Sequence, residues 1–193
     1  MGKYEYHRIS ELAQNLEKAG IDQSIIDQIM KDGETIRKGT TSEKKAEWMK
    51  GAMSRMDKLL DSQTRHSVRE ACACCLGGTR LKIAKDIAKQ NESLEDRIQA
   101  ANKANLVFGN SVTLQEDRQI LVRFAPEGLP HYGCHCLPKA KEPISITYCY
   151  CCGGHIKHHL QIALGRKLEC KVRSSALSSG GKKPCSFLFR MIE

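Results

Sequence analysis

The chain has 193 residues, about the length of one ordinary domain and enough to bury a core without disulfide support. Hydrophobic residues make up 40% and charged residues 27%, which excludes disordered and fibrous proteins, and no stretch approaches the ~20 apolar residues of a membrane span. The net charge is +9, and most of the excess lies in residues 134–193, which contain ten basic and three acidic side chains.

The N-terminal sequence MGKYEYHRISEL lacks the apolar core of a secretory signal. We therefore expect a cytoplasmic protein in a reducing compartment. There, the ten cysteines favour metal binding or thiol chemistry over disulfides.

Apolar residues recur at helical spacing through the first half of the chain. Capping residues mark three of the expected starts: Asp22, Thr40 with Glu43, and Ser93 with Asp96. The expected helices include Ile9–Leu16, Ile25–Met30, Met49–Leu60, Arg69–Cys75, Leu81–Ala88 and Leu94–Ala101.

The pattern changes near residue 110 to strand-like alternation. Residues 125–143, which are rich in proline, are expected to form a loop. Gly153-Gly154 is expected to end the strand that precedes it, and a helix that ends at Gly165 is expected to follow. The expected strands are Val112–Leu114, Ile120–Phe124, Ile144–Tyr150, Leu168–Val172 and Ser186–Met191.

We therefore predict an α+β protein, in which a helical N-terminal half precedes an antiparallel sheet packed on helices. Residues 1–109 would form a mainly helical region that carries a C-x-C-C cluster. Residues 110–193 would form an α+β, ligand-binding-like region with a cysteine-rich turn, and the two together one compact unit.

Eight of the ten cysteines lie in three short clusters, at 72–75, 134–136 and 149–152. Two C-x-x-C pairs, one in the first cluster and one in the last, would supply the four ligands that zinc prefers. An iron–sulfur cluster is the alternative cofactor, although the spacings match neither common ferredoxin pattern. Buried thiols that merely fill the core are a third alternative. The candidate metal ligands are Cys72, Cys75, Cys134, Cys136, Cys149, Cys152 and His155.

Cys152 and His155 also suggest a catalytic pair. Cys152 precedes the expected helix, whose N-terminus would lower the pKa of its thiol, and His155 follows three residues later as a base. His158 and His159 are expected on the surface.

The C-terminal segment, from Cys149-Tyr-Cys-Cys-Gly-Gly-His155 to LECKVRSSALSSGGKKPCSF ending at Phe187, resembles two related bacterial groups. These are the 4-vinyl-reductase-like small-molecule-binding domain and the L-2-amino-thiazoline-4-carboxylate hydrolase-like family. The resemblance covers about the last 45 residues well. It implies an antiparallel sheet packed on helices around an apolar ligand pocket. It also implies roles, zinc ligation among them, for Cys152, His155, Cys170 and Cys185.

The leading hypothesis is a cytosolic zinc-binding protein with a small-molecule pocket beside the Cys149–His155 turn. One alternative is a hydrolase or thiol-dependent enzyme that uses Cys152 and His155. Another is a basic, nucleic-acid-associated accessory protein, which is disfavoured because no aromatic residues interleave with Lys and Arg. We expect a small-molecule ligand and no membrane partner, and a homodimer is left open.

Overall fold

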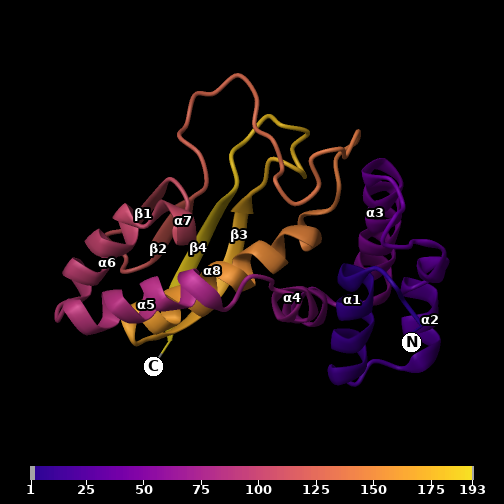
Figure 1. Ribbon diagram of the computed structural model, residues 1–193, viewed down its shortest axis with the longest axis horizontal. Helices are drawn as coiled ribbons and strands as arrows, with labels where there is room; N and C mark the ends of the chain where they lie inside the picture. The colour runs from indigo at the N-terminus through magenta and orange to yellow at the C-terminus, as the bar shows by residue number, and fades with distance from the viewer. Residues whose placement is uncertain (1–2, 193) are drawn as a thin grey trace.

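The computed structural model describes residues 3–192 (Figure 1). Its helices are α1 (His7–Lys18), α2 (Gln23–Ile29), α3 (Ser42–Leu59), α4 (Ser62–Ala71), α5 (Gly78–Gln90), α6 (Leu94–Lys103), α7 (Asn105–Phe108) and α8 (Tyr150–Leu164), with short 3-10 turns η1 (Gly33–Thr35) and η2 (Ile146–Cys149). Its strands are β1 (Ser111–Leu114), β2 (Ile120–Arg123), β3 (Lys167–Ser174) and β4 (Ser186–Ile192).

The four strands form one antiparallel sheet in the order β1-β2-β4-β3. Helices α5, α6 and α8 lie beside this sheet, whereas α1, α2 and α3 gather at the opposite end of the molecule with α4 between the two groups (Figure 1). The expected α+β class is confirmed. One hydrophobic core includes residues from both halves, from Ile9 in α1 to Phe189 in β4.

Of the three predicted helix caps, Ser93 is confirmed, whereas Asp22 occupies the N-cap position of α2 without a side-chain capping hydrogen bond. The Ser93 hydroxyl accepts a hydrogen bond from the Asp96 backbone N–H at 3.0 Å and donates to the Asp96 carboxylate at 2.7 Å, as a capping residue should. Helix α3 is capped by Thr41, whose side chain accepts from the Lys44 N–H, and not by Thr40. The Thr40 hydroxyl instead accepts from the backbone N–H of Arg37.

The segment Ile144–Tyr150 is not the strand that the sequence predicts. Ser145 caps a 3-10 turn by accepting a hydrogen bond from the Thr147 N–H, and α8 follows directly from Tyr150. Residues 147–150 are all buried, so the alternation of residue types does not reflect two different faces. The expected strand is wrong because this segment is enclosed on every side and satisfies its backbone locally.

Gly153 and Gly154 lie inside α8, so they do not separate a strand from the helix as the sequence predicts. A Cβ atom on Gly153 would lie 2.6 Å from the Cys170 sulfur of β3. On Gly154 it would lie 2.9 Å from the Cα and carbonyl carbon of Glu70 and closer still to the carbonyl oxygen. The two glycines therefore allow α8 to approach β3 and α4 closely, which places the cysteines that precede them.

Candidate functional site

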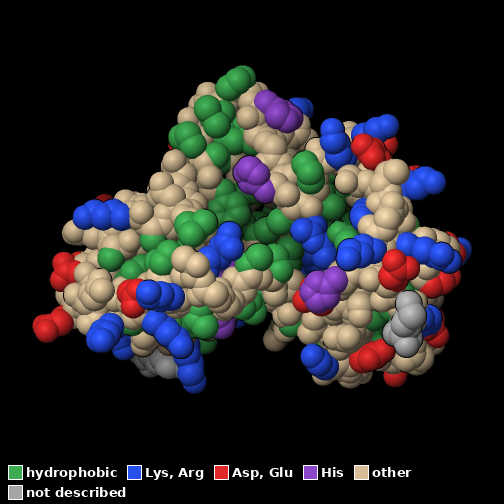
Figure 2. All heavy atoms as spheres, in the orientation of Figure 1, with side chains coloured by type: hydrophobic (Ala, Val, Ile, Leu, Met, Phe, Trp, Pro, Cys, Tyr) green, Lys and Arg blue, Asp and Glu red, His purple; other side chains and the backbone are tan. Residues whose placement is uncertain are grey.

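The start of α8 meets α1, α3 and α4 at a small cavity that we call the thiol cavity. It has room for about one water-sized atom. Figure 2 shows a hollow in this part of the molecule, with hydrophobic side chains at its floor and Lys and Arg side chains along its border. The lining residues are Arg8, Glu11, Met49, Arg69, Cys72, Cys74, Cys136, Tyr148 and Cys151.

Two thiols from different segments come together at this site, and we call Cys136 and Cys152 the thiol pair. Their sulfurs are 3.6 Å apart, close to van der Waals contact and without a bond. Cys136 belongs to the loop between β2 and η2, and Cys152 to the first turn of α8. The sequence predicted ligands in both segments, and the structure brings these two together.

The thiol pair is electrostatically unequal. Hydrogen bonds from the Cys134 and Cys152 thiols lower the pKa of Cys136 well below its usual range, and the Arg8 guanidinium adds to this effect. The Cys152 thiol donates its hydrogen bonds to Cys136 and Cys151, and this raises the pKa of Cys152. Burial raises it further. Cys136 is therefore the thiolate of the pair and Cys152 the thiol. This reverses the expectation that the start of the helix would activate Cys152.

Two arginines face these thiols. Arg69 in α4 is only 3% exposed, and its Nη2 donates to the Tyr148 carbonyl oxygen at 3.1 Å, while its Nε has no partner. Arg8 in α1 donates from Nη1 to the Cys136 carbonyl oxygen at 2.6 Å and to the Tyr148 hydroxyl at 3.1 Å. The two guanidiniums thus approach the thiol cavity from α1 and α4.

Neither guanidinium has a carboxylate partner within 4.0 Å in the part of the chain from 3 to 192. A buried cation without a counter-charge is costly, so nearby thiols are favoured in their anionic form. For Cys151 a hydrogen bond from Cys152 and the charge of Arg69 lower the pKa against the opposing effect of burial. The site is therefore a cluster of thiols in which hydrogen bonds from neighbouring thiols, aided by two arginines, lower the pKa of Cys136 and of Cys151.

The cysteines at 72–75 are less reactive than their C-x-x-C spacing predicts. The Cys72 thiol donates to the Val68 carbonyl oxygen at 3.3 Å, and burial raises its pKa, so it is a neutral thiol. Cys74 lines the thiol cavity, but burial and its neighbour Cys75 raise its pKa to about 11. Cys75 is exposed, with a φ of 60°, and does not line the cavity.

His155 has a different partner from the one that a catalytic pair requires. Its Nδ1 lies 2.8 Å from the Cys74 carbonyl oxygen, whereas the Cys152 sulfur contacts Cys136. His159 is fully buried, which corrects the expectation that it lies on the surface, and its Nε2 is 3.2 Å from the Cys75 carbonyl oxygen. Helix α5 and the segment before it cover this face of α8, so the histidines anchor the backbone of that segment.

The remaining cysteines lie apart from the thiol pair. The Cys149 sulfur is 2.9 Å from the Ser175 hydroxyl, and the Cys185 sulfur accepts a hydrogen bond from the Ala176 N–H. Cys170 pairs with Phe189 in the sheet register, four residues further along the chain than Cys185, which directly precedes β4. Adjacent strands therefore do not bring Cys170 and Cys185 together, because each residue along a strand adds about 3.3 Å.

No group of three or more Cys, His, Asp or Glu side chains between residues 3 and 192 is arranged to hold a metal ion. Zinc or iron–sulfur binding thus stays a prediction. Over the same residues, no helix is both long enough and apolar enough to cross a membrane.

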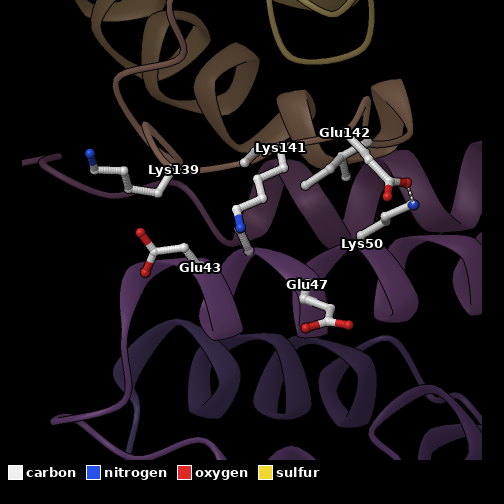
Figure 3. Close-up of a pocket in the computed structure, with 9 residues that line it drawn as sticks. Glu43, Glu47, Lys50, Lys139, Lys141 and Glu142 are labelled. Atoms are coloured by element: carbon white, nitrogen blue, oxygen red, sulfur yellow. Dashed lines mark hydrogen bonds and ion pairs between the residues drawn. The ribbon is translucent and has the colours of Figure 1, made fainter.

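A larger pocket lies elsewhere, between α3 and the segment 139–144 (Figure 3). It has a volume of about 320 Å³ and is bordered mainly by charged side chains rather than by the apolar lining that the resemblance implies. Lys141 extends toward α3 near Glu43 and Glu47, and Lys50 is ion-paired with Glu142. The cavity beside the Cys149–His155 turn is the much smaller thiol cavity.

The model of a family of unknown function, DUF6144, matches residues 5–188. The chain belongs to this family. No curated protein and no solved structure was found to match the chain. The match spans α1 with Arg8, α4 with Arg69 and all ten cysteines, so the whole candidate site lies within the family region.

Sequence reasoning missed the two arginines, Tyr148 and the role of Cys151. A signal was present for Arg69, which lies next to Val68 and three residues before Cys72 on the buried face of α4. An arginine on a buried helix face needs an anionic or carbonyl partner, and the adjacent Glu70 is instead paired with Lys157, which leaves the nearby cysteines as candidates. Arg8 gave no such signal, because its partners lie more than 120 residues away.

Proposed function

We propose that this protein performs thiol–disulfide exchange with the thiol pair, Cys136 as the attacking thiolate and Cys152 as the resolving thiol. The observation that carries the proposal is the 3.6 Å separation of the two free sulfurs beside two guanidiniums that lack carboxylate partners. Thiolates are the nucleophiles of exchange, and a neighbouring thiol is what completes it. This is a form of the thiol-dependent enzyme among the sequence hypotheses, but with Cys136 instead of Cys152 as the nucleophile, Cys152 as the resolving thiol and no role for His155 as a base.

The reaction balances without an external cofactor. The Cys136 thiolate attacks one sulfur of a substrate disulfide R–S–S–R′, forming a mixed disulfide Cys136–S–S–R and releasing R′–S⁻. Cys152 then attacks the Cys136 sulfur, forms the Cys136–Cys152 disulfide and releases R–S⁻, which takes the proton from Cys152. The substrate is reduced by two electrons and the thiol pair is oxidised by two. Arg8, which bonds to the Cys136 backbone, stabilises the attacking thiolate.

Trapping of the mixed disulfide tests these two roles. The Cys152→Ser variant, incubated with glutathione disulfide, is expected to accumulate glutathione on Cys136, because the resolving thiol is missing. The Cys136→Ser variant should remain unmodified at residue 152. Cys170→Ala is the matched control, since Cys170 lies under Gly153 and away from the pair. Glutathione on neither Cys136 nor Cys152 in any variant would overturn the proposal, as would equal modification of both single variants.

Zinc binding is the second candidate, and one observation favours it. The Cys136 and Cys152 sulfurs are 3.6 Å apart, and interactions with Cys134 and Cys151 shift the pKa values of these thiols. Two arginines beside them would offset the negative charge of a zinc tetrathiolate. Metal analysis of protein purified without added metal separates the candidates: stoichiometric zinc that is lost in Cys136→Ser supports a metal centre, and metal-free protein that forms the disulfide supports exchange.

A further inference from the structure

The thiol cavity contains space, and in Arg69 a positive charge, that the steps of disulfide exchange do not use. It has room for one water-sized atom, it lies beside Cys136, and its wall includes both Arg8 and Arg69. The Nε of Arg69 has no hydrogen-bond partner although the side chain is 3% exposed. A buried donor without a partner indicates a missing acceptor at that place.

The chemistry of the lining narrows the identity of that acceptor. Two guanidiniums without carboxylate partners line this space, and a neutral water would leave their charge uncompensated, whereas an anion would offset it. The one carboxylate of the lining, Glu11, is paired with His7 at 3.2 Å. A single polarisable anionic atom suits a wall of sulfurs and guanidiniums better than a neutral one does. Sulfur is such an atom, and it forms reversible bonds with thiolates.

We infer that the site accepts a single sulfur atom, carried as a persulfide on Cys136, with its terminal sulfur in the thiol cavity between the two arginines. This rests on the proposed function, because it uses the same attacking and resolving thiols. The substrate class is then a persulfide donor, R–S–SH, either a small molecule or a protein.

The transfer balances as follows. The Cys136 thiolate attacks the outer sulfur of R–S–SH, the donor S–S bond breaks, and R–S⁻ leaves as the new S–S bond forms on Cys136. Cys152 then attacks the inner sulfur of Cys136–S–S⁻ and transfers its proton to the leaving group, which gives hydrosulfide and the Cys136–Cys152 disulfide. The outer sulfur is reduced to sulfide and the thiol pair is oxidised. A small thiol acceptor can instead take the outer sulfur and restore the Cys136 thiol.

Loading with glutathione persulfide under anaerobic conditions tests this inference. Reduced Cys152→Ser protein, freed of excess donor, is expected to gain the mass of one sulfur atom on the peptide that contains Cys136 and to yield one thiocyanate per chain with cyanide. The wild-type protein should release hydrosulfide and form the disulfide. In Cys152→Ser/Arg69→Met, loading is expected to be about tenfold slower, because a charge-assisted hydrogen bond is lost.

Two outcomes would overturn the inference while leaving the proposed function intact. One is a Cys152→Ser protein that forms the glutathione mixed disulfide but carries no cyanide-labile sulfur. The other is equal loading rates with and without Arg69→Met, which would make the cavity a water site only. Adding Arg69→Lys to Cys152→Ser controls for folding, since lysine retains the charge and should restore most of the rate. Failure of both the mixed disulfide and the persulfide would reject the thiol-pair proposal itself.

Discussion

The glycine pair of α8 offers a sharp test of how the site is positioned. In Gly154→Ala, the new methyl group would lie 2.9 Å from the Cα and carbonyl carbon of Glu70, which belong to the backbone of α4 and cannot rotate away. Helix propensity alone would favour alanine by about 1 kcal/mol. Overpacking against backbone costs about 1–3 kcal/mol or more, and separating α4 from α8 also loosens the contacts of Arg69. We expect a net loss of about 2 kcal/mol.

Gly51→Ala in α3 is the matched control. Its methyl group would contact only the guanidinium end of Arg55, which can move. The helix-propensity gain should therefore appear alone, at about 0.5–1 kcal/mol. For a chain of this size, these values correspond to a melting temperature lower by about 4–8 °C in Gly154→Ala and higher by about 1–4 °C in Gly51→Ala. Equal positive shifts in both variants, measured by thermal denaturation under reducing conditions, would refute the close approach of α4 and α8.

Three further predictions concern buried polar groups. Arg69→Met removes a cation beside Cys151, so the pH at which thiolate absorbance appears should rise, whereas Arg69→Lys should change it little. His159, which faces two other histidines and Arg80, has its pKa lowered to about 4 by burial. Below about pH 6.5 the unfolded chain therefore binds more protons than the folded protein. The free energy of unfolding should fall by up to about 3 kcal/mol as the pH drops to 4. Urea titrations of His159→Gln should show a smaller decrease over the same pH range. Arg97→Met leaves the Leu164 carbonyl oxygen and two others without their donor, and should lower the urea unfolding free energy by about 2–3 kcal/mol; an unchanged midpoint would contradict this role.

Local signals in the sequence account for much of the fold. Ser93 caps α6 as expected, and Gly165 ends α8 with a φ of 65°, a left-handed conformation that favours glycine. Strands β1, β2, β3 and β4 all contain segments that alternate or run apolar in the sequence. These features depend on neighbours within a few residues, and such interactions are the ones that a sequence pattern records.

The errors arise where distant contacts decide the structure. Residues 146–149 form a 3-10 turn, and Tyr148 receives hydrogen bonds from both Arg8 and Arg69, whose places in the fold no local pattern reveals. Glycine usually disfavours a helix, but Gly154 lies within α8 because only a residue without a side chain leaves room for the backbone of Glu70 in α4.

The sequence predicts which cysteine segments belong to the candidate site, but not how their side chains are arranged. Clustering of cysteines indicated that the 134–136 and 149–152 segments carry the chemistry, and Cys136 lies against Cys152. Which of the two is the thiolate depends on Cys134 and on Arg8, which belongs to the first helix. Spacing alone gives no access to such contacts. The lowered pKa expected at Cys152 occurs instead at Cys136, through hydrogen bonds from Cys134 and Cys152 and the charge of Arg8.

The most direct measurement of the central claim is the disulfide map of the wild-type protein, equilibrated in glutathione buffers of increasing oxidation, quenched by alkylation and read by peptide mass spectrometry. We expect Cys136 joined to Cys152 as the first disulfide to form, with Cys72, Cys149 and Cys170 alkylated as free thiols. Free Cys136 and Cys152 in buffers that already oxidise other cysteines, or a first disulfide between any other pair, would contradict the account.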